Sequence, residues 1–219
     1  MQTKSRTEGS SALMPLVLTG ILLIAGFVFM GSSIVLAAPI TTAPGQNKLT
    51  CFDGTTDGGY TGVCTLNSKG AKGSATLNNN DGDLDPYNNY SGVYVLNSTM
   101  YETLLSGITQ LSFSYTGDAA TAGSPRISIP VDTNDDGVSD GYLFASAYYC
   151  NDGAGMVDII NDPTCQIYTN FSADSFANWA ELVALHPAWA IANDAYVFLV
   201  ADDPGSWTVS NVKFGKAGK

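Results

Sequence analysis

Short segments rich in β-branched and aromatic residues recur along the chain, and they restrict its fold more than any other feature. In 111–115 and 126–131 the apolar side chains take alternate positions, so each strand would turn one face to a core and the other to water. Pro130 predicts an edge position or a strand end. The pattern predicts an all-β fold, a jelly-roll-like sandwich of two antiparallel sheets, with strands at 74–77, 92–96, 110–115, 126–131, 142–149, 166–169, 195–201 and 207–214.

One short helix is predicted from about residue 174 to residue 185. Apolar side chains around Trp179 recur at intervals of three and four, and Ser172 or Asp174 could cap its start. His186 and the proline after it would end the helix, and we expect this histidine to interact with the last helical carbonyls.

The N-terminus predicts export from the cytoplasm. Residues 12–36 are almost entirely apolar, follow the basic residues Lys4 and Arg6, and end at Ala37 in a pattern that signal peptidases cleave. Cleavage after Ala37 is the expected outcome. An uncleaved segment would be long enough to anchor the protein in a membrane through residues 12–36, and this alternative stays open.

Three regions follow from this interpretation: 1–37 as signal peptide or membrane anchor, 38–47 as a linker or extended arm, and 48–219 as one β-sandwich domain. Glu8 and Gly9 precede the apolar stretch, which leaves open a third interpretation, a prepilin-like subunit of an extracellular filament.

The charge balance restricts the partners. The formal net charge is −11, and after residue 37 the only arginine is Arg126. Nucleic acid is therefore excluded as a partner, because phosphate binding needs clustered Lys and Arg. Crowded carboxylates favour a divalent cation instead.

The cysteines are even in number, which predicts disulfides in an exported chain. Three pairings are possible, and we expect the local one, Cys51 with Cys64 and Cys150 with Cys165, because both intervals are rich in Gly, Asp and Asn. Zinc is not expected, since the chain has no C-x-x-C spacing and one histidine.

The most specific motif is D-x-N-x-D-G-x-x-D at residues 132–140. It would bind Ca²⁺ through four side chains and one backbone carbonyl, while a glycine at its sixth position allows a sharp turn. The expected ligands are Asp132, Asn134, Asp136, Val138 through its carbonyl, and Asp140. The motif resembles the calcium loops of integrin α-chains and FG-GAP repeats more than those of EF-hands or dockerins, because position 12 is Leu143 rather than glutamate or aspartate. A solvated Asp-Asn turn without a metal ion is the alternative. The resemblance implies a loop between two strands.

A second acidic cluster, at residues 79–85, carries side-chain oxygens at alternate positions but lacks the full motif. An ordinary acidic loop is the alternative to a second metal site here. The candidate ligands are Asn79, Asp81, Asp83 and Asp85.

Much of 70–214 resembles secreted bacterial β-sandwich proteins that have no assigned activity. The resemblance lies in residues 111–117, Ser124-Pro125-Arg126, the calcium motif, and the ending from Ala201 to Val212. This ending, a strand, an Asp-Pro-Gly turn and a final strand, is also similar to the last hairpin of carbohydrate-binding jelly rolls. These resemblances imply a fold and no substrate.

The expected function is non-enzymatic. A hydrolase triad would need His186 as its base, and no Gly-x-Ser-x-Gly motif accompanies it. We expect an exported, calcium-stabilised protein of the cell surface or medium with a structural or adhesion role, and a surface glycan or another surface protein as partner. A carbohydrate-binding module and a self-assembling filament subunit are the alternatives. Candidate sugar-stacking side chains are Tyr87, Tyr90, Tyr148, Tyr149 and Trp189.

Overall fold

The computed structural model describes residues 47–54, 62–68, 73–80, 89–150 and 155–216. The predicted export segment and nearly all of the predicted arm lie outside these residues, so the three predicted regions remain predictions.

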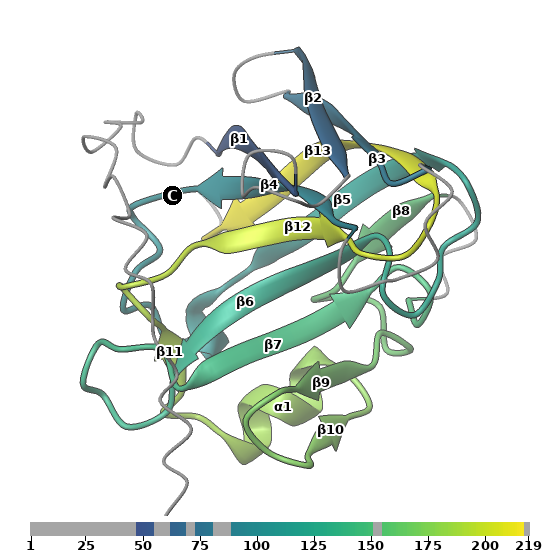
Figure 1. The fold of residues 1–219 in the computed structure, drawn as a ribbon. Coiled ribbons are helices and arrows are strands. Elements are labelled where there is room, and N and C mark those ends of the chain that lie inside the picture. The colour runs from purple at the N-terminus through teal and green to yellow at the C-terminus, as the bar shows by residue number, and fades with distance from the viewer. Residues whose placement is uncertain (1–46, 55–61, 69–72, 81–88, 151–154, 217–219) are drawn as a thin grey trace, which may run out of the picture. The chain divides into compact units, whose positions relative to one another are not determined.

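The described strands form two antiparallel sheets (Figure 1). Sheet A has the order β1 (Lys48–Asp53), β4 (Ser91–Leu96), β12 (Val197–Ala201), β6 (Arg126–Asp132), β7 (Gly141–Ser146), β9 (Ile167–Thr169) and β10 (Ser175–Phe176), and β11 (Ala190–Ile191) also pairs with β6. Sheet B has the order β2 (Val63–Ser68), β3 (Ser74–Asn78), β13 (Ser206–Gly215), β5 (Gln110–Gly117) and β8 (Met156–Asp158). The predicted two-sheet β-sandwich with one short helix is confirmed.

The core lies between the two sheets because alternate side chains of each strand point inward. Sheet A contributes Val93, Leu199 and Ile127, and sheet B contributes Phe113 and Val209; none of these has exposed surface. Phe113 and Trp207 are among the largest side chains that are fully buried.

All eight predicted strands are present, with ends shifted by up to three residues. Five described strands were not predicted: β1, β2, β8, β10 and β11. The last three contain three residues or fewer, too few to show a period of two. β1 and β2 alternate weakly, since each is an edge strand with few fully buried side chains.

The prediction for Pro130 was wrong, because this residue lies inside β6 in the interior of sheet A. On one side it is in register with Tyr142 of β7. On the other side β6 changes neighbour, pairing with β12 up to Ser128 and with β11 from Val131. A residue without an N–H is tolerated where the ladder is interrupted in this way.

The helix α1 (Trp179–Leu185) is shorter than predicted, because Ser175–Phe176 form β10 and the N-cap is Asn178. The Asn178 side chain accepts a hydrogen bond from the Glu181 N–H at 3.0 Å, and the Glu181 carboxylate accepts one from the Ala177 N–H at 2.6 Å. This reciprocal pair satisfies two N–H groups at the start of the helix. The predicted end at His186 is confirmed. No helix in the described part of the chain is long and apolar enough to span a membrane.

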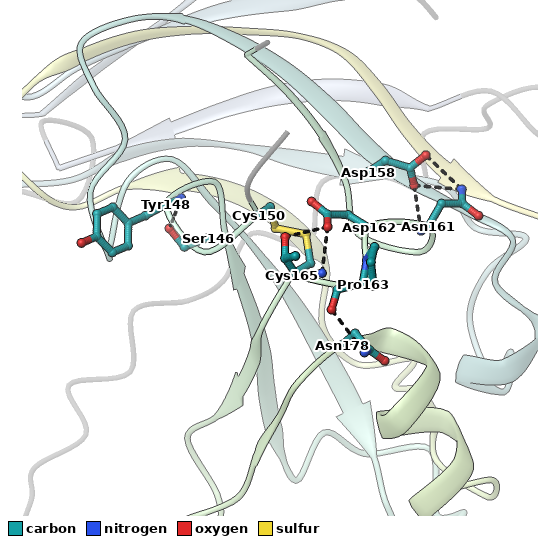
Figure 2. The surroundings of a disulfide bond; sticks show 10 residues. Ser146, Tyr148, Cys150, Asp158, Asn161, Asp162, Pro163, Cys165 and Asn178 are labelled. Atoms are coloured by element: carbon teal, nitrogen blue, oxygen red, sulfur yellow. Dashed lines mark hydrogen bonds between the residues drawn. A yellow bond between two sulfur atoms is a disulfide. The ribbon is translucent and has the colours of Figure 1, made fainter. Parts of the chain in front are cut away.

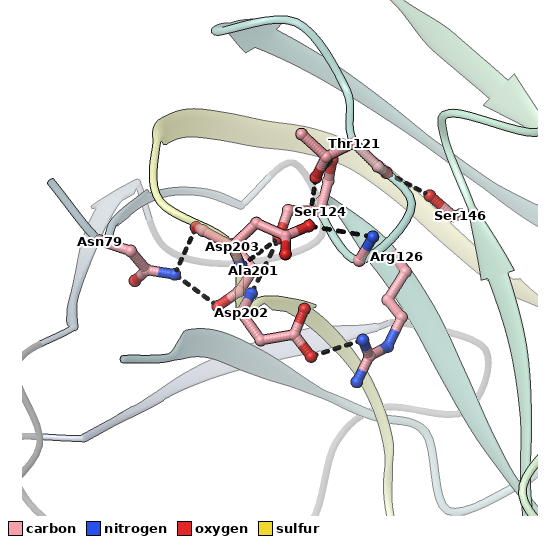
Figure 3. Close-up of polar contacts among 9 residues, drawn as sticks. Asn79, Thr121, Ser124, Arg126, Ser146, Ala201, Asp202 and Asp203 are labelled. Carbon is pink, nitrogen blue, oxygen red and sulfur yellow. Dashed lines mark hydrogen bonds and ion pairs between the residues drawn. The ribbon is translucent and has the colours of Figure 1, made fainter. Parts of the chain in front are cut away.

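The expected final hairpin is absent, because β12 belongs to sheet A and β13 to sheet B. The Asp-Pro-Gly segment between them is a crossover between the sheets (Figure 3). The Ser124 hydroxyl oxygen accepts hydrogen bonds from the Asp202 and Asp203 N–H groups, both at 2.8 Å. The Asp203 carboxylate accepts hydrogen bonds from the Thr121 hydroxyl and, at 3.0 Å, from the Gly123 N–H. These bonds hold the crossover against the loop before β6.

Candidate functional site

The loop between β6 and β7 contains the calcium motif and is built around Asp132, the last residue of β6. This side chain is only 3% exposed. Its Oδ1 accepts hydrogen bonds from the N–H groups of Asn134 at 3.0 Å and Asp135 at 2.7 Å, and more weakly from Asp136 at 3.4 Å. Its Oδ2 accepts one from Gly137 at 2.6 Å. One carboxylate thus organises the whole first half of the loop.

The pKa of Asp132 reflects two opposing effects. Desolvation by burial raises it, but the hydrogen bonds from the backbone N–H groups of residues 137, 134, 135 and 136 together outweigh desolvation. The pKa therefore lies below its ordinary value, and the carboxylate is ionised at neutral pH.

Gly137 occupies the sixth position of the motif and has a φ of +82°, a conformation that favours glycine. A Cβ atom built at this position would lie 2.9 Å from Nδ2 of Asn193. The sequence prediction that a glycine allows the sharp turn here agrees with both observations.

The other three predicted side-chain ligands are exposed and also bond to the loop. Asn134 Oδ1 accepts a hydrogen bond from the Asp136 N–H at 3.1 Å, and Asp136 Oδ1 accepts one from the Val138 N–H at 2.8 Å. Asp140 Oδ2 accepts hydrogen bonds from the Thr133 N–H at 2.8 Å and hydroxyl at 2.5 Å. The loop is therefore closed by its own hydrogen bonds.

These donors fit calcium in chemical kind, since all are hard oxygens and Asp132 is ionised. The positions of the donors, however, do not form a metal site: within the described residues no group of three or more His, Cys, Asp or Glu side chains is disposed to hold a metal ion. Calcium binding by Asn134, Asp136, Val138 and Asp140 together with Asp132 would require the exposed side chains to turn toward one point.

Two residues outside the motif fasten the loop to the segment after β11. The Asn193 N–H donates to the Gly137 carbonyl at 3.0 Å, and the Ser139 N–H donates to the Asp194 carboxylate at 2.9 Å. Sequence analysis missed Asp194, because 55 residues separate it from Ser139 and no local pattern marks it.

The second predicted metal cluster is described only at Asn79, because Asp81, Asp83 and Asp85 lie outside the described residues. Asn79 is 1% exposed. Its amide donates to the carbonyls of Ala201 at 2.7 Å and Asp203 at 3.3 Å, and its Oδ1 accepts a hydrogen bond from the Ser91 hydroxyl at 2.8 Å (Figure 3 shows the first two bonds). Here the amide links β3, β4 and the crossover.

Both predicted disulfides are confirmed. The Cys51–Cys64 bond joins β1 to β2, the edge strands of sheets A and B. Cys150 follows β7, and Cys165 precedes β9 (Figure 2). The chain between them leaves sheet A, adds β8 to the edge of sheet B, and returns. The bonds indicate an oxidising compartment outside the cytoplasm.

Figure 2 shows how the second bond is connected to the helix: Nδ2 of the N-cap Asn178 donates to the Pro163 carbonyl at 3.3 Å, within the loop that the bond closes. In the same loop, the Asp158 carboxylate accepts hydrogen bonds from Nδ2 of Asn161 at 2.9 and 3.1 Å. These polar contacts lie among residues that bridge the two sheets.

The described members of the predicted sugar-stacking set lie at three separate places. The Tyr90 ring lies 6.3 Å from Phe52, the Tyr149 ring lies 5.2 Å from Tyr168, and Tyr148 is 59% exposed beside Tyr149. Trp189 lies elsewhere. Tyr87 is outside the described residues.

Trp189 packs at the end of α1, where its ring stacks on His186 at 3.7 Å with an angle of 16° between the planes. The rings of Phe171 and Phe176 also pack edge-to-face with Trp189, with ring centres 5.5 and 6.3 Å from its centre. The indole and the imidazole thus pack against each other, and both are only partly exposed.

A charged pair lies where β6 begins and β12 ends. Arg126 Nη1 lies 2.5 Å from Asp202 Oδ2 (Figure 3), and its guanidinium lies 5.0 Å from the centre of the Phe144 ring. Burial raises the pKa of Asp202, Arg126 lowers it, and the nearby Asp203 raises it; the net pKa lies above its ordinary value. The sequence contains no local signal for this pair.

Neither a comparison with protein-family models nor a search of curated proteins finds a match for this chain.

Proposed function

We propose that this protein is an exported, calcium-stabilised β-sandwich of the cell surface or extracellular medium, with a non-catalytic structural or adhesion role. The observation that carries the proposal is the placement of the two disulfides. Cys51–Cys64 joins the sheets at one edge, and Cys150–Cys165 closes the excursion to the opposite edge of sheet B. A domain braced in this way suits an environment without chaperones or reductants.

Calcium enters the proposal through the loop after β6. The ionised Asp132 and the tight turn at Gly137 form a frame from which Asn134, Asp136 and Asp140 could contribute oxygens. The three predicted ligand carboxylates, Asp132, Asp136 and Asp140, repel one another within nine residues, and a bound cation would remove that repulsion. The loop would then hold the ends of β6 and β7 more firmly.

The experiment for calcium is thermal unfolding of the purified protein in EDTA and in millimolar Ca²⁺. An ion that binds only the folded loop stabilises by about 2.7 kcal/mol at a hundredfold excess over Kd, which would raise the melting temperature by several degrees. Mg²⁺ should raise it less, because it demands octahedral geometry.

The Asp136→Ala variant should lose most of the calcium-dependent rise, while the matched Asp135→Ala variant should keep it. Both changes remove one negative charge from the same loop, but only residue 136 holds a predicted ligand position. Identical melting curves of the wild-type protein in EDTA and Ca²⁺ would contradict the calcium proposal.

The adhesion role is tested separately. The secreted protein, purified and labelled, should be retained by washed cells or extracellular matrix of the organism that produces it. Retention equal to that of an unrelated acidic protein of similar size would contradict an adhesion role, whatever the calcium result.

A further inference from the structure

The outer face of sheet A carries aromatic side chains where a sheet facing water usually carries polar ones. Residues in register across neighbouring strands share a face, which places Tyr94, Phe198, Ser128, Phe144 and Tyr168 in one row. Phe52 lies on the same face, because it is in register with Gly92, two residues before Tyr94. Tyr142 also lies on it, two residues before Phe144 on β7. We define the aromatic face as the rings of Phe52, Tyr94, Tyr142, Phe144, Tyr168 and Phe198.

Apart from Tyr168, which is placed on the aromatic face by its register with Phe144, the rings of this face contact one another. Ring centres are 4.5 Å apart for Phe52 and Tyr94, 5.7 Å for Phe52 and Phe198, and 5.4 Å for Tyr142 and Phe198. Tyr142 and Phe144 lie side by side on β7, with centres 6.4 Å apart and 18° between their planes. Strands β1, β4, β12 and β7 therefore share one aromatic layer. In Figure 1 the ribbons of β12, β6 and β7 pass in front of β5 and β8 of sheet B.

Among the described residues, side chains fill the centre of this layer. Ser128 and Val200 point to the same side as the rings, yet Ser128 has no exposed surface and Val200 is 4% exposed. The Phe52 ring packs directly over Gly92, so that a Cβ atom on residue 92 would lie 2.3 Å from the ring. The rings themselves stay partly exposed. A surface of this kind suits a flat ligand more than a small molecule that needs a pocket.

The chemistry of the face combines apolar rings with hydroxyl groups. The hydroxyl groups belong to Tyr94, Tyr142 and Tyr168. Tyr196 is 41% exposed and borders these residues, since its ring centre lies 5.4 Å from that of Tyr94. Burial, with Asp194 nearby, raises the pKa of Tyr142, so its hydroxyl stays protonated and can donate a hydrogen bond. A pyranose ring needs this combination, because its C–H face is apolar and its edge carries hydroxyls.

Charge narrows the choice of ligand. No member of the aromatic face is charged, and the adjacent Arg126 is paired with Asp202. An anionic polymer or a second copy of this chain would meet a protein of net charge −11, which repels both. A neutral ligand meets no such repulsion.

We propose that the aromatic face binds a neutral polysaccharide, whose sugar rings stack on Tyr142, Phe144 and their neighbours while tyrosine hydroxyls bond to sugar hydroxyls. The proposal rests on the adhesion role and names its partner. Two of the residues expected from sequence could extend the surface: the Tyr90 ring lies 6.3 Å from Phe52, and the Tyr148 ring lies 5.0 Å from Tyr149, which in turn neighbours Tyr168.

The test is retention of the full secreted protein by insoluble cellulose, chitin and mannan, together with affinity electrophoresis in soluble xylan, galactomannan and mixed-linkage β-glucan. Alginate and polygalacturonate serve as anionic counterparts. At least one neutral polysaccharide should bind and both anionic ones should not.

Four variants locate the site. Tyr142→Thr and Phe144→Thr remove a ring from an outward strand position that threonine suits, and each should weaken binding about tenfold. Tyr142→Phe keeps the ring and the fold and should weaken binding a few-fold through loss of the hydroxyl. The control Met156→Thr removes an exposed apolar side chain from β8 in sheet B and should bind as the wild type does.

Absence of binding to every neutral polysaccharide would overturn the proposal, as would equal binding by wild type and both threonine variants. Self-association that Tyr142→Thr abolishes, measured by sedimentation, would identify the face as a contact between copies and would also overturn it. Retention on source cells alongside failure on all neutral polysaccharides would leave the adhesion role standing and remove this inference.

Discussion

At the scale of single residues, Asp132 is the side chain on which the β6–β7 loop depends. It is buried, and its hydrogen-bond partners in the loop are backbone N–H groups. Four backbone N–H groups converge on this one carboxylate. Replacing this residue therefore affects the free energy of unfolding even without calcium.

Asp132→Asn, measured in EDTA, should lower the free energy of unfolding by about 2 kcal/mol at pH 7, because hydrogen bonds to a charged acceptor are stronger than those to a neutral one. The pKa of Asp132 is lowered in the folded state, so its stabilisation is fully present above the unfolded pKa of about 3.9 and is lost as pH falls through the folded pKa. The gap between wild type and variant should hence be constant above about pH 5 and narrow below about pH 4.

Urea denaturation across pH 3 to 7 measures this gap. Asp135→Asn is the control, since the same loop loses the same charge from an exposed side chain. A gap that stays constant down to pH 3 would contradict the role assigned to the Asp132 carboxylate.

At the scale of elements, Asn79 shows how three segments that are distant in sequence are joined. It directly follows β3 of sheet B, accepts a hydrogen bond from Ser91 at the start of β4 in sheet A, and donates to carbonyls at the end of β12 and in the crossover to β13. Its side-chain amide supplies two hydrogen-bond donors and one acceptor, a combination that neither an aspartate nor a serine side chain provides.

Asn79→Ala should lower the free energy of unfolding by about 2 to 3 kcal/mol, because it leaves buried carbonyl and hydroxyl groups without their partner. The neighbouring Asn80 has an exposed side chain, and Asn80→Ala should change stability by less than about 0.5 kcal/mol. Chemical denaturation of both variants compares them. Equal stability of the two would mean that water replaces the Asn79 bonds.

Sequence predicted the elements whose own residues carry a period. Strands such as β5 and β6 were found because alternation over several residues is a local property. The two-residue strands β10 and β11 exist only through their neighbours in sheet A, and Asn178 could be recognised as a cap only once Ser175–Phe176 was known to be a strand. The aromatic face escaped prediction for a related reason: β7 alone does not show whether Tyr142 or Leu143 points to the core.

At the scale of the whole molecule, the disulfides connect the sandwich where its sheets have free edges. β1 and β2 are terminal strands of their sheets, and each pairs with one neighbour only among the described strands. Cys51–Cys64 ties these two edges together, so fraying of one strand is limited by the other.

Replacing Cys51 and Cys64 by serine should lower the free energy of unfolding by about 3 kcal/mol in the chain-entropy model, and the Cys150–Cys165 pair should have a similar effect. Hydrogen exchange should separate the two variants. Loss of Cys51–Cys64 should speed exchange in β1 and β2, whereas loss of Cys150–Cys165 should speed exchange in β8 and β9. Exchange that rises uniformly in both variants would contradict this local bracing.

The position of Cys51 within β1 also decides how the domain would respond to a pulling force. A tether ahead of Lys48, combined with a partner bound on a sheet, would apply tension to β1 first. The paired residues of β1 and β4 would then separate one after another, beginning at Lys48. This separation stops at Cys51, because its disulfide bond to Cys64 transfers the tension to sheet B. Only Lys48, Leu49 and Thr50 can yield before that point, so the domain would stretch by about 10 Å and then hold.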